Sequence, residues 1–521
     1  MTPLTAVLAS AGLVIPHIDY TALAPELILL GGVLVLIGVS AMTPRRAPTG
    51  VYATMTVAVA VAALVASLRL WRDVANHGAF TTVAHSVDVD GFAVYFLVLV
   101  PCILVVAAII GSGYLRREGI AGCEYYALAL ISGSGAMLMA SANDLIFIFL
   151  ALEVLSIPLY VLAGFDRRRT TSQEAAIKYF VLGAFSSAVF VYGIALVYGA
   201  TGSTNLAEIG AFLAHNVITA NGVLLAGIAL LIVGFSFKVA AVPFHMWTPD
   251  VYQGAPTPVT GFMAALAKAG GFAAFLRVFV STFPTLRGDW QPVIWALAAV
   301  TLLGGAIVAL AQRDVKRMLA YSSINHAGFV LIGLQAATTK GVAASAYYVF
   351  AYAFMVLGSF AVVGVVGAKG DRQHDLEAYR GLAARNPVLA TVFTVLLLAQ
   401  AGVPFTTGFF AKFYVVAASV GAHSYALAVI AMGSAAIAVF FYLRVVLLMY
   451  SAQPAGPGDE AAATSGGAGG VATLVHTPVG RLVVQPSVAL GLAVSVGVTV
   501  VFGVWPQPLI DFARAATLIF H

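Results

Sequence analysis

The sequence is poor in charged residues. Only 9% of its 521 residues are Asp, Glu, Lys or Arg, whereas 61% are hydrophobic, and the mean hydropathy is +0.98. A water-soluble domain usually carries about 25% charged residues, so this chain lacks the polar surface of a soluble fold. The composition therefore predicts a chain embedded in lipid.

Cysteine is also scarce. The two cysteines, Cys102 and Cys123, form no CxxC, CxxCH or four-cysteine pattern, which excludes an iron–sulfur cluster and a c-type haem in this chain. No nucleophile, metal or nucleotide motif is present, so a self-contained enzyme is disfavoured. Residues 1–17 lack a basic segment before their apolar stretch, and we expect the following helices to carry the targeting information.

Long apolar runs are present from end to end. A helix rises about 1.5 Å per residue, so about 20 apolar residues cross about 30 Å of hydrocarbon. Lengths of this size favour helices over barrel strands and predict an all-α polytopic membrane protein. The runs predict about fourteen spans: 24–42, 51–70, 91–113, 123–141, 144–165, 174–200, 221–243, 256–282, 291–311, 317–336, 341–367, 387–418, 424–450 and 486–510.

The basic residues gather in alternate loops. The net charge is +5 and the pI about 9.1, but the short clusters between apolar runs indicate membrane orientation rather than nucleic-acid binding. One set of loops holds Arg45, Arg46, Arg116, Arg117, Arg167, Arg168, Arg169, Arg313, Lys316, Arg317, Lys369, Arg372, Arg380, Arg385 and Arg481. The other set, with its flanks, holds Arg69, Arg72, Arg287, Lys340 and Arg514. The first set is therefore predicted to be cytoplasmic, with both termini outside.

Two segments do not read as membrane spans. Residues 451–480 are small, polar and Gly-rich, which predicts a disordered cytoplasmic loop. Residues 368–386 are charged and predict a short surface helix.

An acidic residue stands in the middle of an apolar run. Glu153 lies nine residues after Asp144, roughly 13 Å along a helix and near the bilayer centre. A charge at that depth costs at least about 3 kcal/mol on insertion scales, so it needs a partner or water. The carboxyl either staples helices through an ion pair or takes part in a proton relay.

Three lysines lie at comparable depth. Lys238 precedes Pro243 by five residues, and proline predicts a break in that helix. Lys268 lies about 18 Å along its helix from Pro256, among glycines that allow a close approach by another helix or water. Lys412 follows a second VPF sequence, 403–405, which echoes 242–244 and suggests two broken-helix half units. Each lysine is either a structural cation or a proton carrier.

Other ionisable residues are open to a simpler interpretation. Lys178 follows Glu174 by four residues, which is also a common surface pairing, and it could extend to the cytoplasmic face. His326 and His245 have the side chain best suited to proton transfer near neutral pH. A buried histidine, however, often only packs and makes hydrogen bonds within the core. Arg277 and Arg444 are interpreted as packing or interfacial residues.

Lysine suits a relay because burial strips water from an ammonium group, which then holds its proton less tightly. A nearby carboxylate such as Glu153 reverses that effect. A carboxylate whose influence on a lysine is switched on and off would make that lysine bind and release its proton. A row of such lysines joined by water would form a proton relay.

The same segments resemble a known family over roughly residues 120–420. The matching stretches are SANDLIFIFLALEVLSIPLYVL, SQEAAIKYFVLGAFSSA, FKVAAVPFHMWTPDVYQGAPTPVTGF, DVKRMLAYSSINHAGF and GVPFTTGFFAKFYV. They resemble subunit N of bacterial NADH-quinone oxidoreductase (respiratory complex I), more closely than the sister subunits M and L. The HMWTPDVYQGAPTPVT stretch is the most specific.

The resemblance implies an antiporter-like fold with two inverted five-helix repeats and broken helices. The implied divisions are three N-terminal helices (1–120), a first repeat (121–282), a second repeat (283–450) and a final helix with a tail (486–521). The composition adds a flexible cytoplasmic loop before that final helix, at 451–485.

The resemblance also implies roles for individual residues. Glu153 and Lys238 would form the coupled ion pair, Lys268 the central relay and Lys412 the terminal group facing the outer side. Lys178 and His326 match supporting positions of the family, and we add His245 as a further supporting candidate.

The implied function is that of a non-redox subunit of the NADH:quinone oxidoreductase in a bacterial inner membrane, which translocates protons as quinone is reduced elsewhere. No cofactor is expected here, since NADH, FMN, iron–sulfur clusters and quinone are bound by other subunits of that complex. The expected partners are subunits M, K and a J-like neighbour, together with the lipid bilayer, and no nucleic acid. Two alternatives stay open: a cation/proton antiporter subunit of the Mrp type, and a structural subunit with inert buried ion pairs.

Overall fold

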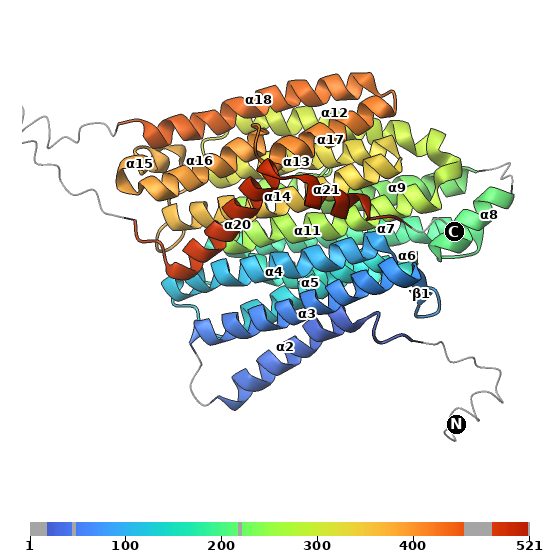
Figure 1. Cartoon of the computed structure of the whole chain (residues 1–521), viewed down its shortest axis with the longest axis horizontal. Helices are drawn as coiled ribbons and strands as arrows, with labels where there is room; N and C mark the ends of the chain where they lie inside the picture. Colours follow the sequence, from blue (N-terminus) through green and yellow to red (C-terminus); the bar gives the residue numbers. More distant parts are fainter. Residues whose placement is uncertain (1–17, 44–47, 217–220, 453–481, 519–521) are drawn as a thin grey trace, which may run out of the picture.

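Long helices running side by side make up most of the chain in the computed structural model (Figure 1). The structure describes residues 18–43, 48–216, 221–452 and 482–518. Its long helices are α2 (Ala24–Met42), α3 (Thr49–His77), α4 (Gly91–Glu118), α5 (Glu124–Ser141), α6 (Leu145–Ala163), α7 (Thr170–Thr201), α9 (Gly222–Val239), α11 (Thr257–Arg277), α12 (Arg287–Leu310), α13 (Val315–Ala336), α14 (Thr339–Val366), α16 (Pro387–Ala401), α17 (Thr407–Gly421), α18 (Tyr425–Tyr450) and α20 (Pro486–Val504).

Each predicted span coincides with one or more of these helices, so the all-α membrane class is confirmed. Eleven described helices are long and apolar enough to cross a membrane by length and composition. The helices α5 and α13 and the pair α16–α17 are not among those eleven, so the predicted number of fourteen is not confirmed.

The two ends of the bundle differ in composition. One end, called the arginine-rich end below, holds Arg116, Arg117, Arg168, Arg169 and Arg372. The other, the hairpin end, holds a β-hairpin in which β1 (Phe80–Thr82) pairs antiparallel with β2 (Val87–Val89), and the helix α8 (Leu206–His215). The sequence did not lead us to expect the hairpin, α8, or the short helices α10 (Trp247–Gly254) and α21 (Gln507–Arg514).

Both predicted helix breaks are present. The helix α9 ends at Val239, where Ala240 has a φ of 63°, and the chain then runs to α10. The helix α16 ends at Ala401, where Gly402 has a φ of 93°, and α17 starts at Thr407. Because a positive φ ends helical hydrogen bonding, each VPF segment lies in a non-helical connection beside a buried lysine.

Polar residues define where several helices begin. The Asp90 carboxylate accepts a hydrogen bond from the Ala93 amide at 2.7 Å, and the Asp144 carboxylate accepts from the Ile146 and Phe147 amides. Asp314 does the same for α13. Such caps satisfy amides that the first helical turn leaves without partners, which matters most where no water is available.

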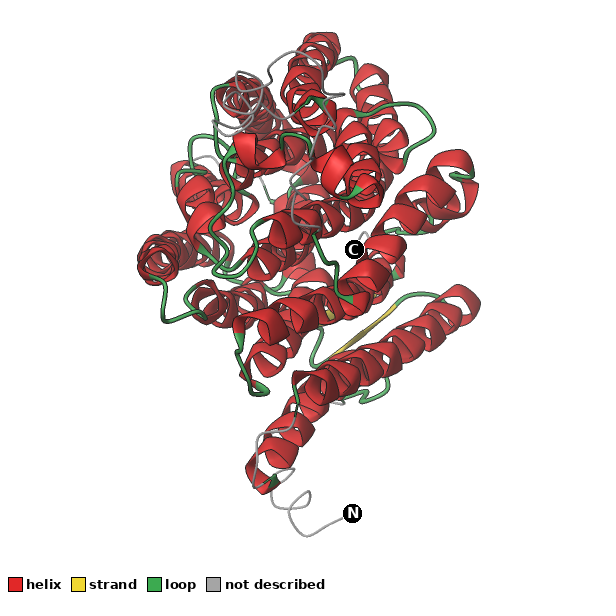
Figure 2. Ribbon diagram, turned by 90° about the vertical axis from the view of Figure 1, so that its left-hand side faces the viewer, coloured by secondary structure: helices red, strands yellow, loops and turns green. Residues whose placement is uncertain are grey.

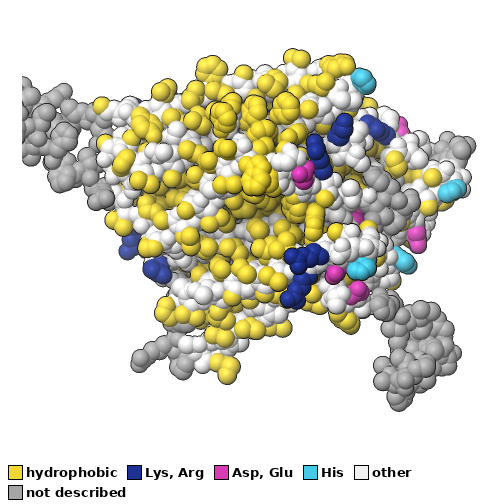
Figure 3. All heavy atoms as spheres, in the orientation of Figure 1, with side chains coloured by type: hydrophobic (Ala, Val, Ile, Leu, Met, Phe, Trp, Pro, Cys, Tyr) yellow, Lys and Arg dark blue, Asp and Glu magenta, His cyan; other side chains and the backbone are white. Residues whose placement is uncertain are grey.

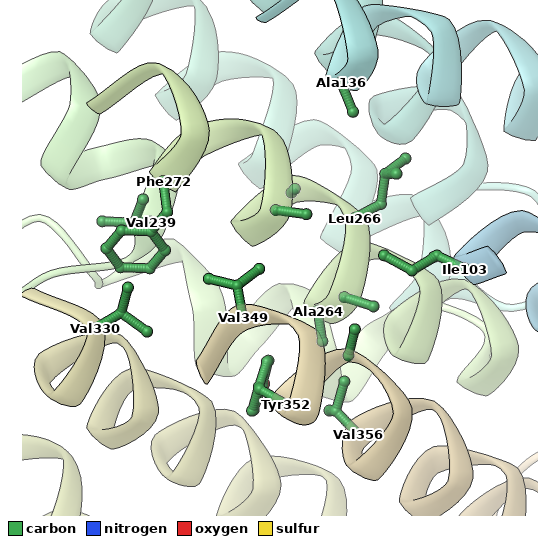
Figure 4. Close-up of a cluster of buried hydrophobic side chains, with 14 of the residues drawn as sticks. Ile103, Ala136, Val239, Ala264, Leu266, Phe272, Val330, Val349, Tyr352 and Val356 are labelled. Atoms are coloured by element: carbon green, nitrogen blue, oxygen red, sulfur yellow. The ribbon is translucent and has the colours of Figure 1, made fainter. Parts of the chain in front are cut away.

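The helix α11 lies at the centre of the bundle. Every residue from Thr257 to Arg277 is buried, and the helix packs against α4, α5, α6, α9 and α14. Figure 4 shows side chains from several of these helices meeting around α11, among them Ala136, Val239, Phe272 and Val349.

Hydrophobic side chains also predominate on the outer face that Figure 3 shows, with Lys and Arg side chains towards its two ends. This pattern suits a lipid-facing surface.

The pair α2–α3 forms one edge of the bundle. Figure 1 shows α2 diverging from its neighbours, and Figure 2, turned by 90°, shows this edge projecting from the rest of the bundle. The predicted surface helix in 368–386 is confirmed in part, as a 3-10 turn at Leu376–Tyr379 and a four-residue helix, α15 (Leu382–Arg385). The predicted disordered loop 451–480 lies almost wholly outside the described residues. The division into repeats at 121–282 and 283–450 stays a prediction.

Candidate functional site

Three buried lysines come from three different helices of the bundle. Lys238 lies in the last turn of α9, Lys268 in the middle of α11 and Lys412 in the second turn of α17. Their exposed fractions are 4%, 4% and 7%. Among the described residues, each ammonium group makes one hydrogen bond to a neutral oxygen and no ion pair. An ammonium has three donors, so each lysine keeps donors available.

Lys238 and Glu153 approach each other without direct contact. The Lys238 ammonium donates to the Ser156 hydroxyl at 2.7 Å, and Ser156 follows Glu153 by three residues on α6. Glu153 instead accepts a hydrogen bond from the Ser187 hydroxyl of α7. The implied coupled ion pair is therefore not formed in this structure, where a serine is the partner of each group.

Glu153 also lines a groove at the surface of the bundle. The groove runs between α6 and α7, has a volume of about 610 Å³, and half of its lining residues are alanine or serine, among them Ala184 and Ala188. The carboxyl is thus reachable from beside the chain as well as from its interior.

A glycine brings Lys238 close to α11. A Cβ atom on Gly271 would lie 3.2 Å from Cγ of Lys238 and 3.1 Å from Cγ1 of Val239. Gly271 follows Lys268 by three residues, so both lie on one face of the helix. The expected close approach at the glycines beside Lys268 is confirmed.

Lys268 leads into a polar network around His326. Its ammonium donates to the Ser323 carbonyl oxygen and lies 5.5 Å from the ring centroid of Tyr352. The two ring nitrogens of His326 lie 2.7 Å from the Tyr348 hydroxyl and 3.1 Å from the Tyr442 hydroxyl. Each hydroxyl can both donate and accept, so this cluster can pass a proton in either tautomer of the ring.

The network continues towards Lys412. The Tyr442 hydroxyl contacts the Ser322 hydroxyl and, at 3.5 Å, Oε1 of Gln400. Gln400 is followed by Ala401, whose carbonyl oxygen accepts from the Lys412 ammonium at 2.8 Å. His326, Gln400 and Lys412 therefore belong to one buried polar region shared by α13, α16, α17 and α18.

Lys178 lies at the arginine-rich end. It pairs with Glu174 at 2.7 Å, as the spacing predicted, and with Asp250 at 2.9 Å. Asp250 also pairs with Arg317 at 2.7 Å. Burial would raise the pKa of Asp250, but the hydrogen bonds from Lys178 and Arg317 outweigh it and hold the pKa below its usual range. Glu174, Lys178 and Asp250 line a polar pocket of about 550 Å³, which offers water access to this end of α7.

His245 stands apart from the three lysines. It lies in the connection between α9 and α10, where its ring packs against Tyr321 with 6.3 Å between ring centroids. Its Nδ1 is buried with no hydrogen-bond partner among the described residues.

The two arginines have structural surroundings, as interpreted. Arg277 is 1% exposed and pairs with Asp90 at 2.8 Å and Asp88 at 3.1 Å, while its Nε donates to the Ala140 carbonyl oxygen. Arg444 donates to the Leu310 carbonyl oxygen at the bundle surface.

Sequence reasoning missed the neutral members of the site. These are Ser156, Ser187, Ser322, Ser323, Tyr348, Tyr352, Gln400 and Tyr442, and also the charged Asp250. A hydroxyl or amide within an apolar run was the available signal, but such residues are frequent in membrane helices and single out no site.

Comparison with known proteins places the chain in a family. Residues 142–438 match the family described as "NADH:quinone oxidoreductase/Mrp antiporter, TM", and all seven candidate site residues fall within this match. NADH-quinone oxidoreductase subunit N 3 of Streptomyces griseus is 41% identical, with 96% of this chain and 94% of the relative covered. Subunit N of Trichlorobacter lovleyi is 40% identical, with 96% and 97% covered.

The chain belongs to the family of NADH-quinone oxidoreductase N subunits.

Solved structures agree with this N-subunit family. A chain of respiratory complex I from Thermus thermophilus with bound aureothin superposes with a TM-score of 0.75 at 31% identity, covering 94% of this chain and 98% of that chain. A chain of the Mrp complex from Dietzia sp. DQ12-45-1b has a TM-score of 0.81 at 19% identity, covering 96% and 97%. The second likeness concerns the fold alone. The antiporter-like fold is therefore confirmed, and the curated relatives favour the N subunit over the Mrp alternative.

Proposed function

We propose that Glu153, Lys238, Lys268 and Lys412 form the relay by which this chain moves protons through the membrane. As a member of the N-subunit family, the chain is a multi-pass, proton-translocating membrane subunit of NADH-quinone oxidoreductase. The observation that carries the relay is the set of three buried lysines without a carboxylate partner among the described residues.

A comparison within the chain supports this assignment. Among the residues that the structure describes, the other deeply buried cations are Arg277 and Lys316, and both lie beside carboxylates: Asp88 and Asp90 for the arginine, and Asp371 at 3.6 Å for the lysine. A buried charge that serves only structure needs such a partner, because an unpaired charge in a medium of low polarity is strongly disfavoured. A lysine without one is stable only if it can release its proton, which is what a relay requires.

The proposed path follows the contacts. Protons would enter from the arginine-rich end, proposed to be cytoplasmic, through the polar pocket of Lys178 and Asp250. They would pass Lys238 and Lys268, cross the His326 network and leave from Lys412 towards the outer side. Glu153 would modulate Lys238, and the groove beside it would let a neighbouring subunit act on the carboxyl. His245 would play at most a supporting part.

The redox chemistry is proposed to lie elsewhere in the complex. NADH, FMN, iron–sulfur clusters and quinone would be bound by other subunits, and this chain would have no active site of its own. The proposed neighbours are subunits M, K and a J-like subunit, which belong with it to one membrane assembly.

The test uses the purified complex carrying Lys268→Met, reconstituted into vesicles. Proton uptake per NADH oxidised is expected to fall sharply while the complex still assembles, because methionine fills the same space without a titratable group. Lys340→Met, at an exposed lysine of the hairpin end, is the matched control and should pump normally. Normal pumping by an assembled Lys268→Met complex would favour the structural alternative, and a strict sodium requirement would favour the Mrp alternative.

A further inference from the structure

A pocket at the arginine-rich end lies outside the proposed relay. It has a volume of about 250 Å³ and is bounded by α4, the end of α14 with the residues that follow it, and the start of α20. Its apolar lining residues include Ile110, Phe360 and Val488. Its polar lining residues are Tyr114, Arg117, Lys369 and Gln485.

Three polar atoms of this pocket are buried without a hydrogen-bond partner among the described residues. They are the hydroxyl of Tyr114, Nη2 of Arg117 and Oε1 of Gln485. Tyr114 is 5% exposed, so its hydroxyl has little access to water. Buried polar groups are normally hydrogen-bonded, and two orphan donors beside one cavity, the Tyr114 hydroxyl and Nη2 of Arg117, indicate a site for a ligand that accepts hydrogen bonds.

The charges of the pocket select an anion. Nε and Nη1 of Arg117 are held by Glu118 and the Gly364 carbonyl oxygen, which leaves Nη2 for a ligand. Lys369 is exposed and makes no ion pair within the described part of the chain. Glu118 offsets one positive charge and Lys369 keeps the local balance positive. The N-terminal end of α20, with its free amides, adds to the positive potential.

The surroundings favour a lipid as the source of that anion. The pocket lies where α4 ends and α20 begins, at the level of the basic residues and next to the hydrophobic outer face. Figure 3 shows Lys or Arg side chains at this edge, beside a broad apolar surface. A phosphate bound by the polar lining residues would leave its glycerol and acyl carbons to the apolar ones, as in the basic pockets between membrane helices that bind lipid head groups.

We propose that this pocket binds the phosphate group of a membrane phospholipid, with Tyr114, Arg117 and Lys369 as its ligands. The proposal is independent of the proton relay. The phospholipid would join α4, α14 and α20 at one point and would belong to the leaflet on the arginine-rich side.

Photo-crosslinking of the whole complex tests the site. The purified complex is reconstituted into phosphatidylethanolamine and phosphatidylglycerol vesicles with a trace of phosphatidylglycerol that carries a diazirine near its glycerol. Crosslinks are mapped to peptides and are expected at residues 110–117 and 482–488. The double variant Tyr114→Phe, Lys369→Gln should lower this yield about tenfold, since it removes a hydroxyl donor and a charge.

Two control variants separate binding from folding. Tyr125→Phe removes another buried hydroxyl that has no partner among the described residues and lies outside this pocket, so its crosslink yield should equal that of the wild type. Ala361→Leu fills the pocket without changing its charge and should also abolish the crosslink.

The outcomes discriminate between ligands. Competition by unlabelled phospholipid and not by inorganic phosphate supports the proposal. Loss of the crosslink on addition of inorganic phosphate would show that the site binds the free ion. An unchanged crosslink yield in an assembled complex that carries the double variant would show that the pocket holds water and no phospholipid. Either of the last two results overturns the proposal.

Discussion

At the residue scale, the buried cations of this chain fall into two groups that differ in their partners. Lys316 lies 3.6 Å from the Asp371 carboxylate, whereas Lys238, Lys268 and Lys412 each donate to a neutral oxygen. The first arrangement keeps a charge fixed, and the second allows it to be lost and regained. The partner of a buried lysine therefore decides how readily that lysine is loaded with a proton.

Ser156 provides the sharpest test of this rule. Ser156→Ala removes the only hydrogen bond that the Lys238 ammonium makes among the described residues. A hydrogen bond to a charged group contributes roughly 1.5–3 kcal/mol, so the loaded form becomes harder to reach and coupled turnover should fall about tenfold or more. Steady-state NADH oxidation and proton uptake in vesicles measure the effect.

Ser132→Ala is the matched control. Ser132 is also buried, but its hydroxyl donates to the Leu155 carbonyl oxygen and contacts no lysine. Equal rates in the two variants would show that Ser156 supports the helix rather than the ammonium.

The charged residues of the site could be predicted from the sequence, whereas the neutral ones could not, for a physical reason. A lysine or glutamate in the middle of an apolar run is costly, so its presence demands an explanation. Serine and tyrosine are tolerated there and demand none. The partners are also distant in the chain: Tyr442 reaches His326 across 116 residues. No spacing rule predicted that Ser156 would be the partner of Lys238 in place of Glu153.

At the scale of elements, the broken helices position the lysines. At the end of α16 the Ala401 carbonyl oxygen accepts a hydrogen bond from Lys412, and Lys238 lies in the last turn of α9, just before its break. Proline and the VPF sequences predicted both breaks, because proline interrupts helical hydrogen bonding locally. The β-hairpin and α8 were missed, since neither is long enough to show a membrane-span pattern.

Gly402 tests how strictly the second break positions Lys412. The residue has a φ of +93°, and a Cβ atom there would lie 2.9 Å from Cδ of Lys412. Gly402→Ala should strain the backbone by roughly 1–3 kcal/mol and displace the lysine. If about 1 kcal/mol of that strain adds to the activation barrier of proton transfer, pumping should fall roughly fivefold.

Gly421→Ala is the control for this change. Gly421 ends the same helix, α17, and a Cβ atom there would meet nothing within 4 Å. Normal pumping by Gly402→Ala would mean that Lys412 does not need this geometry.

At the scale of the whole molecule, one carboxylate joins distant parts of the bundle at the arginine-rich end. Asp371, in the segment after α14, pairs with Arg169 before α7 at 2.9 Å and with Lys316 on α13 at 3.6 Å. It also accepts hydrogen bonds from Thr257 at the start of α11, and His374 lies 3.1 Å away. Burial would raise the pKa of Asp371, but Lys316, His374 and Arg169 outweigh it and hold the pKa well below its usual range.

The stability of the complex should therefore depend on pH through Asp371. A carboxyl whose pKa is lowered by folding contributes stability above its unfolded pKa, near 3.9, and loses it as the pH falls through the folded value. Asp371→Asn should lower the free energy of unfolding by about 3–5 kcal/mol at neutral pH, because it leaves buried cations unpaired. The gap to the wild type should hold from pH 8 to 5 and narrow only below about pH 4.

Thermal unfolding of the purified complex across this pH range measures that gap. A gap that closes already between pH 7 and 6 would contradict the assignment of this stability to Asp371.

Lys238→Ala is the decisive test of whether the buried lysines carry protons. Proton uptake per electron, NADH oxidation and assembly are measured together in vesicles that contain the complex. If the lysines do, the complex assembles and both proton uptake and coupled turnover fall sharply. Unchanged proton uptake per electron in an assembled Lys238→Ala complex would contradict this role of the lysines.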